Sequence, residues 1–193
     1  MVLRAAFIDE PDSLNVMQNT ITIWESFIFG PLTTRLLKVD NTLYIVPDLA
    51  KDMPIVSPDG LTFTFKLKNG KWSDGRPISA DDVKFSYEYI KSHDLPNYKE
   101  KMKFLKSNEA SDDETVVITL SEPYASAYVK LFTSAILPPQ VFEGLEGPVS
   151  FEPTTPQDLT SGGPFEFKEW KREKYIQTHR KREWLLRSSS IFG

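Results

Sequence analysis

The sequence of 193 residues contains no cysteine, which excludes disulfide bonds, thiolate metal sites and cysteine nucleophiles. Histidine is scarce: only His93 and His179 occur, and neither has a partner at metal-ligand spacing. No apolar run approaches the roughly 20 residues that span a bilayer. The formal net charge of −4 leaves no overall basic surplus for nucleic acid. We therefore expect no metal site, no cofactor and no nucleic-acid partner.

The hydrophobic and aromatic content is that of a folded protein. Hydrophobic residues make up 40% of the chain and aromatic residues 12%, which is enough for a core and argues against disorder. Basic residues gather between positions 166 and 187. They are consistent with a nucleic-acid or membrane patch, but a solvated strand pair is the simpler interpretation.

Catalytic patterns are missing. The sequence has no G-x-S-x-G motif and no phosphate-binding loop. Asp81 and Asp82 form an acidic pair, but carboxylates also favour the first turn of a helix, which is the interpretation that we prefer. We predict that the chain is not an enzyme and has no catalytic residues. A small hydrolase that uses acidic residues is the alternative from a different class.

Residues 60–90 carry the clearest local signals. Apolar and polar residues alternate over 61–68, which predicts a half-buried strand. Asn69-Gly70 and Asp74-Gly75 are turn sequences. Ser79 and Asp82 have the spacing of a capping box, which predicts a helix beginning after Ser79.

Other segments give shorter patterns. Gly30-Pro31 should break a helical stripe that runs from Trp24 towards Leu36, because proline removes a backbone hydrogen bond. We further predict strands over Val2–Ile8 and Thr115–Leu120, a short strand or turn edge over Leu43–Ile45, helices over Lys99–Leu105 and Tyr124–Thr133, a long loop over 143–160, and a hairpin of Phe165–Trp170 with Tyr175–His179.

Five sequence blocks occur in a characteristic order. They are E-P-D-S-L-N at 10–15, V-P-D-L-A at 46–50, W-S-D-G-x-P-x-x-A-D-D-V-x-F at 72–85, L-S-E-P at 120–123 and G-G-P-F at 162–165. Their order and rough spacing, from about Leu3 to about Gln177, resemble the family 5 extracellular solute-binding proteins. These are the oligopeptide- and dipeptide-binding components of ABC importers. Trp72 could stack on a ligand, but the resemblance favours a structural role for it.

The resemblance implies an α+β fold with a mixed β-sheet and flanking helices, forming part of lobe I of a two-lobed, class II periplasmic-binding-protein-like fold. It implies that residues 1–184 are a partial lobe I and that the second lobe is absent. Residues 185–193 resemble nothing in the family, and we expect an atypical, truncated or disordered tail. Members usually have an unbroken helix at the position of Gly30-Pro31, so this sequence departs from the pattern there.

The resemblance also implies the function. We expect an extracytoplasmic protein, periplasmic or a cell-surface lipoprotein at full length, that captures peptides and delivers them to the permease subunits. No secretion signal is recognisable in this sequence. The predicted ligand-binding residues are in one segment, which would offer its backbone to an extended peptide by β-strand addition: Thr20, Ile21, Thr22, Ile23 and Trp24.

Alternatives to peptide binding stay open. Within the family, relatives of this type bind nickel complexes, haem or oligosaccharides instead of peptides. Outside it, besides the hydrolase named above, the chain could be a protein-interaction module. Because a lone lobe would leave apolar surface and strand edges uncovered, we expect weak or no ligand binding by this chain alone and a two-fold homodimer, with the Tyr175–His179 strand and the tail after Trp184 as candidate contacts.

Overall fold

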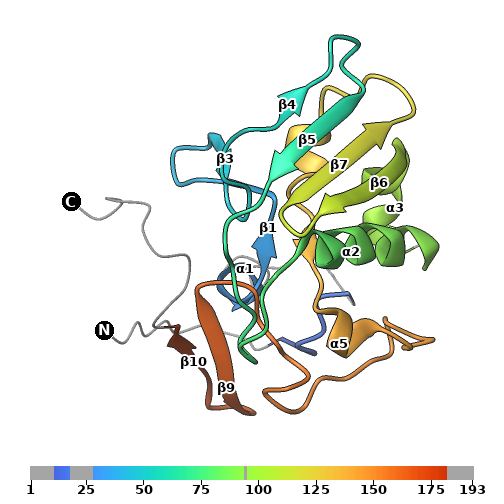
Figure 1. The fold of residues 1–193 in the computed structure, drawn as a ribbon. Coiled ribbons are helices and arrows are strands. Elements are labelled where there is room, and N and C mark those ends of the chain that lie inside the picture. Colours follow the sequence, from blue (N-terminus) through green and yellow to red (C-terminus); the bar gives the residue numbers. More distant parts are fainter. Residues whose placement is uncertain (1–10, 18–27, 94, 182–193) are drawn as a thin grey trace.

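The computed structural model describes residues 11–17, 28–93 and 95–181. Its largest sheet has four strands in the order β4-β5-β7-β6, and α2 and α3 lie against it (Figure 1). These elements are β4 (Ile55–Val56), β5 (Thr62–Lys66), α2 (Ala80–Ser92), α3 (Pro96–Met102), β6 (Leu105–Asp112) and β7 (Thr115–Leu120). Among the described residues, no helix is long and apolar enough to cross a membrane.

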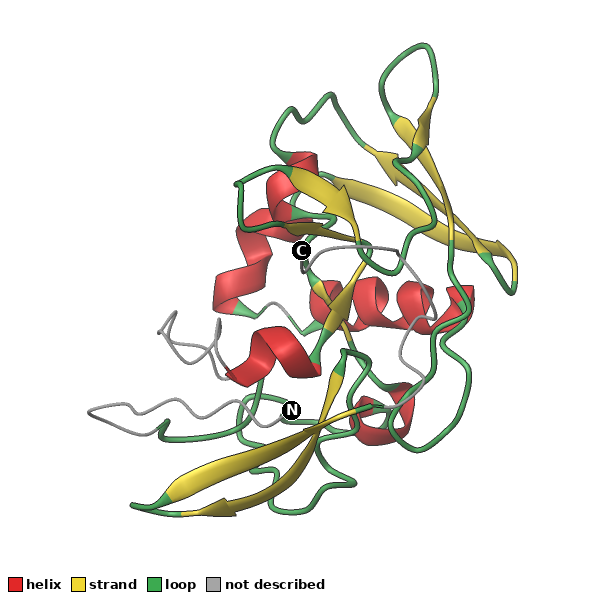
Figure 2. Ribbon diagram, turned by 90° about the vertical axis from the view of Figure 1, so that its left-hand side faces the viewer, coloured by secondary structure: helices red, strands yellow, loops and turns green. Residues whose placement is uncertain are grey.

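The remaining elements form short pairs around this sheet. β1 (Thr34–Arg35) pairs with β8 (Ala135–Ile136), β2 (Leu37–Val39) pairs with β3 (Ile45–Pro47), and β9 (Phe165–Lys171) pairs with β10 (Tyr175–Arg180). The short helices are α1 (Gly30–Leu32), α4 (Ala127–Lys130) and α5 (Pro139–Phe142). Figures 1 and 2 both place the β9–β10 hairpin at the opposite end of the molecule from the four-stranded sheet.

The predicted strand and capped helix of residues 60–90 are confirmed. In β5 the two phenylalanines are buried, at 5% exposure for Phe63 and 0% for Phe65, while the alternate positions Thr62, Thr64 and Lys66 are partly or fully exposed. Ser79 accepts a hydrogen bond from the Asp82 backbone N–H, and the Asp82 side chain accepts one from Ser79. Val83 and Tyr87 then fall on the buried face of α2, as the helical period requires.

Two hydrophobic clusters divide the molecule. The large cluster lies between the four-stranded sheet and α2, and it includes the β2–β3 hairpin and Trp72. The small cluster contains Leu14, Ile28, Leu32 and Phe167, and it sits beneath the β9–β10 hairpin. An isolated two-stranded hairpin is marginal in water, so packing in the small cluster helps to fix β9 and β10 to the rest of the chain.

The α+β class is confirmed, but every strand pair within the described residues is antiparallel, so the mixed sheet that we expected is not found there. The reason is the β6–β7 hairpin. It inserts β7 between β5 and β6, which run in the same direction but are not neighbours.

Several shorter predictions need correction. The helix predicted over Tyr124–Thr133 is reduced to α4, four residues long. The break predicted at Gly30-Pro31 is not seen within the described residues, because Ile28 and Phe29 directly before it are π-helical and α1 continues from them. The helix predicted over Lys99–Leu105 begins earlier, as α3 at Pro96. The strand predicted over Val2–Ile8 lies outside the described residues.

Candidate functional site

The predicted ligand-binding residues Thr20, Ile21, Thr22, Ile23 and Trp24 lie outside the described residues. The described residues on either side of them are buried, with exposures of 2% for Met17 and 7% for Ile28. Both flanks of this predicted ligand segment are therefore fixed in the protein interior. The residues packed around Met17 and Ile28 are therefore the described part of the candidate ligand site.

Asn15, from the first sequence block, anchors the flank on the N-terminal side. Its Nδ2 donates to the carbonyl oxygens of Pro148, at 2.6 Å, and Phe151, at 2.7 Å. Its Oδ1 accepts from the Met17 backbone N–H at 2.8 Å. The side chain is 4% exposed, so all of these bonds are shielded from water. Residues 13–17 are thus held against the loop at 148–152.

Asp48, from the V-P-D-L-A block, has an equally clear structural role. It is 5% exposed. Its carboxylate accepts hydrogen bonds from the Arg35 backbone N–H at 3.0 Å and from Thr34 Oγ1 at 3.3 Å, and it pairs with Lys38 at 3.2 Å. A buried carboxylate needs such partners to replace the hydrogen bonds that it loses to water. This block therefore ties the β2–β3 hairpin to β1.

Trp72, from the longest block, is structural, as the resemblance favoured. It is 3% exposed, and its Nε1–H donates to Asp82 Oδ2 at 2.9 Å. Asp82 therefore serves both the helix cap and the indole. The neighbouring Ser73 exchanges two hydrogen bonds with Ser161, at 2.9 and 3.0 Å, which joins this block to the G-G-P-F block.

Gly162 and Gly163 allow the chain to cross the α1–β1 connection at close range. A Cβ atom on Gly163 would lie 2.3 Å from the Pro31 carbonyl oxygen, and one on Gly162 would lie 2.9 Å from the Trp72 ring. Gly163 N–H donates to the Leu32 carbonyl oxygen at 3.0 Å. The two hydrophobic clusters meet at this crossing.

A small apolar cavity of about 40 Å³ occupies this junction. Residues from three sequence blocks line it: Leu14 and Asn15, Trp72, and Gly162. Val16 and Phe29, close to the two ends of the predicted ligand segment, line it as well. The sequence singled out the blocks separately, and only the tertiary structure shows that they share one cavity. We call it the junction cavity.

Polar groups in the lining are already engaged. Asp158 accepts hydrogen bonds from the backbone N–H groups of Thr154 and Thr155, at 2.9 and 2.8 Å. Burial acts to raise the pKa of Asp158, but these hydrogen bonds outweigh it, so the pKa lies below 3.8. Asp158 is therefore an anion that organises its own loop.

Lys181, directly after β10, ties the hairpin to the same junction. Its Nζ donates to the carbonyl oxygens of Ser161 at 2.6 Å and Lys71 at 3.1 Å. Burial lowers the pKa of Lys181 from 10.5 to about 8, against the opposing effect of Glu166 and Asp74. Sequence reasoning missed this contact, because nothing local to Lys181 indicates the two carbonyl partners.

Other acidic and histidine side chains have structural partners. Asp81 and Asp82 lie in the first turn of α2, as predicted. Asp74 pairs with Arg76 at 3.0 Å, and His93 Nδ1 lies 2.9 Å from the Tyr89 carbonyl oxygen at the end of α2. Within residues 11–17, 28–93 and 95–181, no group of three or more His, Asp or Glu is placed to hold a metal ion.

Comparison with known proteins identifies the fold. The chain is 32% identical over 156 residues to a putative ABC transporter peptide-binding protein of Brucella ovis, covering 80% of this chain and 29% of that protein. It is 31% identical over 177 residues to the oligopeptide-binding protein AppA of Bacillus subtilis, covering 88% and 32%. The chain thus spans about a third of the length of these relatives.

Solved structures agree with this. The structure of AppA from Bacillus subtilis in complex with a nonapeptide matches with a TM-score of 0.75 and 27% identity, covering 91% of this chain and 35% of that one. NikZ from Campylobacter jejuni in complex with Ni(L-His) matches with a TM-score of 0.70 and 28% identity, covering 81% and 31%. Residues 44–188 match the family described as bacterial extracellular solute-binding proteins, family 5 Middle. The chain belongs to the family 5 extracellular solute-binding proteins.

Proposed function

We propose that this chain is the peptide-capturing part of an extracytoplasmic solute-binding protein, and that the whole protein delivers peptides to the permease subunits of an ABC importer. The observation that carries the proposal is the match to AppA, whose solved structure holds a nonapeptide. The relative from Brucella ovis is also named as peptide-binding. Residues 1–184 would be part of one lobe, and residues from elsewhere in the full protein would supply the second.

The mode of binding follows from the predicted segment. Main-chain hydrogen bonds from Thr20–Trp24 to an extended peptide give affinity without reading side chains. The anchors at Asn15 and Ile28 fix both flanks of this segment, which limits the entropy lost when a peptide binds. Closure of a second lobe would add the rest of the affinity, so we expect weak binding by this chain.

A titration followed by protein NMR tests the proposal. A mixture of short peptides, raised to millimolar concentration, should give saturable shifts. Thr22→Pro should weaken this binding because it removes one backbone N–H, whereas Thr22→Ala keeps that N–H and should bind normally. If peptides bind and both variants bind like the parent chain, the proposal is wrong.

A nickel complex is the second candidate ligand. The match to NikZ, whose structure holds Ni(L-His), is the observation that favours it. The same titration with Ni(L-His) distinguishes the two: saturable shifts with the complex and none with peptides would replace the peptide proposal.

A further inference from the structure

The lining residues of the junction cavity that the structure describes are held by hydrogen bonds and close packing. Trp72 is fixed by its hydrogen bond to Asp82. Gly162 packs tightly against this wall, since a Cβ there would lie 2.7 Å from Thr34 Cγ2 and would force a neighbour to move. Leu137 and Phe142, buried at 1% and 4% exposure, form another wall. The space is therefore present before any ligand arrives.

The chemistry of the lining selects an apolar occupant. Most of its side chains are aliphatic or aromatic. The Asn15 amide is committed to three carbonyl oxygens and the Met17 N–H, and Asp158 is committed to the Thr154–Thr155 turn. A polar group placed in the cavity would lose its hydrogen bonds to water without replacement, which is costly.

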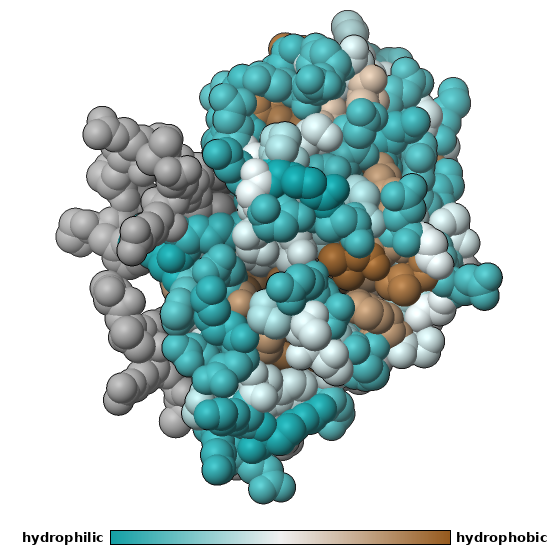
Figure 3. Space-filling view, turned by 60° about the horizontal axis from the view of Figure 1, so that its bottom comes forward, coloured by the Kyte–Doolittle hydropathy of each residue, from teal (hydrophilic) through white to brown (hydrophobic). Residues whose placement is uncertain are grey.

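The size of the junction cavity limits the occupant further. One water-sized group needs roughly 10–15 Å³ of such volume, so a cavity of about 40 Å³ accepts about three heavy atoms. That corresponds to the side chain of valine or proline and excludes aromatic and long side chains. The cavity is partly open to solvent. Figure 3 shows apolar surface in the middle of one face, between polar regions above and below it.

We propose that the junction cavity is a subsite for one short aliphatic side chain of the captured peptide, and this inference rests on the proposed function. In an extended peptide, successive side chains point to opposite sides. One side chain can therefore enter the cavity while its neighbours point away. The cavity adds selectivity at one peptide position to recognition that otherwise uses only the backbone.

Peptides that differ at one position test this proposal. A scan that places alanine, valine or tryptophan at each position of a parent peptide should show one position where tryptophan weakens binding about tenfold or more relative to valine, the range that a hydrophobic pocket supplies. All other positions should tolerate both residues. Binding that is equally tolerant at every position would overturn the subsite and leave the proposed function intact.

A pair of variants locates the effect. Leu159→Phe adds bulk to the lining and should remove the preference for valine at that one position. Leu145→Phe makes the same change in a partly buried leucine outside the lining and should keep the preference. Retention of the preference in Leu159→Phe would contradict the proposal.

Xenon gives a measurement that needs neither a peptide nor a variant. Dissolved xenon binds apolar cavities, and it should shift the NMR signals of the Leu14 and Leu159 methyl groups. Xenon shifts at these methyl groups would support the cavity as described, whether or not this chain alone binds peptides. An absence of xenon shifts at these methyl groups counts against an accessible apolar cavity and overturns the subsite.

Discussion

Leu43 combines two unfavourable properties at the tip of the β2–β3 hairpin. It is 84% exposed, and its φ angle is 66°. This left-handed conformation costs a residue with a Cβ roughly 1–2 kcal/mol, and asparagine tolerates it better. Asp40 holds the loop in place, because its carboxylate accepts hydrogen bonds from the Thr42 and Tyr44 backbone N–H groups.

Replacing Leu43 by asparagine should therefore stabilise the protein. We expect Leu43→Asn to raise the free energy of unfolding by about 0.5–1 kcal/mol, measured by urea denaturation. Leu43→Ala keeps the strained backbone with a Cβ and is the matched control, for which we expect no gain. Equal stability of the two variants would show that the backbone conformation is not the cause.

Gly163 is the residue on which the crossing between the two clusters depends. A Cβ there would meet the backbone of Pro31, Leu32 and Thr33 at 2.3–2.8 Å, and backbone atoms cannot rotate away. Gly163→Ala should lower the free energy of unfolding by about 1–3 kcal/mol, the usual cost of overpacking. In Gly147→Ala the new Cβ meets only the Ser150 hydroxyl, so thermal melting should show a clearly smaller loss.

At the scale of elements, α2 shows how one carboxylate supports two structures. Asp82 closes the capping box with Ser79 and also accepts the Trp72 indole N–H. Ser79→Ala should cost about 0.5–2 kcal/mol. Asp82→Ala should cost more, because the buried indole N–H also loses its partner, at about 1–3 kcal/mol. Chemical denaturation measures both.

Ser92→Ala, at the other end of α2, is the control for this pair. Its hydroxyl donates to the Tyr89 carbonyl oxygen but caps no N–H group. If Ser92→Ala lowers the free energy of unfolding as much as Ser79→Ala does, the measurement does not report the cap.

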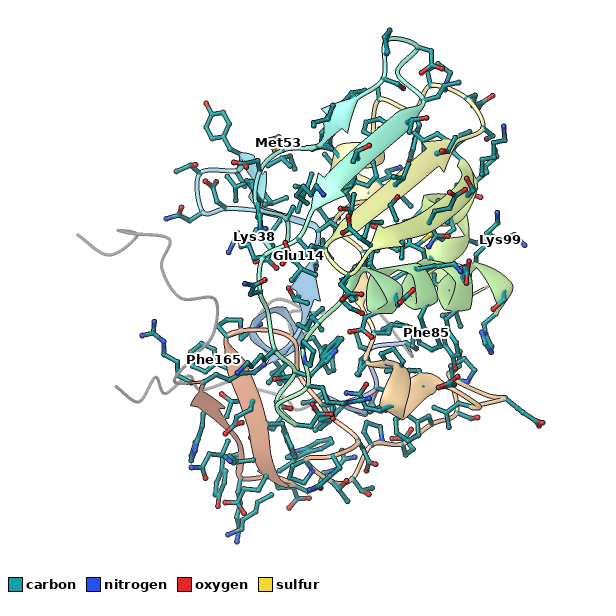
Figure 4. The ribbon with its side chains drawn as sticks, viewed as in Figure 1. Lys38, Met53, Phe85, Lys99, Glu114 and Phe165 are labelled. Carbon is teal, nitrogen blue, oxygen red and sulfur yellow. The ribbon has the colours of Figure 1, made fainter. Side chains whose placement is uncertain are left out.

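Figure 4 places Phe85 beneath α2, and its ring stacks on Tyr89 at 5.3 Å between centroids, so this helix also supports the aromatic side chains below it.

β6 is the longest of the elements that sequence reasoning missed. Its residues, L-K-S-N-E-A-S-D, show no regular alternation of apolar and polar positions. Charged residues are typical of a sheet edge, where they discourage pairing with other chains. Pairing with β7 decides that this segment is a strand, whereas the β-branched run Thr115–Leu120 predicted β7 by itself. Tertiary contacts likewise limit α4 to Ala127–Lys130, although the sequence predicted a helix over Tyr124–Thr133.

At the scale of the whole molecule, Lys181 connects the hairpin to the junction and makes stability depend on pH. Its folded pKa of about 8 lies below its ordinary value of 10.5. Between these values the unfolded chain holds more protons than the folded one, so this group makes the free energy of unfolding rise with pH. Its contribution is complete above pH 10.5 and is lost as the pH falls through 8.

The prediction is a difference between two chains, because tyrosines and other lysines titrate in the same range. The free energy of unfolding of the parent chain, minus that of Lys181→Met, should rise between pH 8 and pH 10.5. Urea denaturation across this range measures it. Parallel curves for the two proteins would mean that Lys181 is not desolvated at the junction.

The two-fold dimer expected from uncovered strand edges stays a prediction. β10 is at the edge of its hairpin and pairs with β9 within the described residues, and light scattering at micromolar concentration would measure the mass. The predicted ligand segment, Thr20–Trp24, likewise stays a prediction, since it lies outside the described residues. The first sequence block nevertheless contains Asn15, which anchors the chain on the N-terminal side of this segment.

The sequence by itself determined the elements whose signals are local. These are β5, β7, the capped start of α2 and the β9–β10 hairpin, because alternation, β-branching, turns and caps act between residues close in the chain. The order of the blocks also determined the family. Only the tertiary structure decided that Leu14, Trp72 and Gly162 share one cavity, that β7 lies between β5 and β6, and that Lys181 binds two distant carbonyl groups. These contacts join residues far apart in the chain, and packing rather than any local pattern selects them.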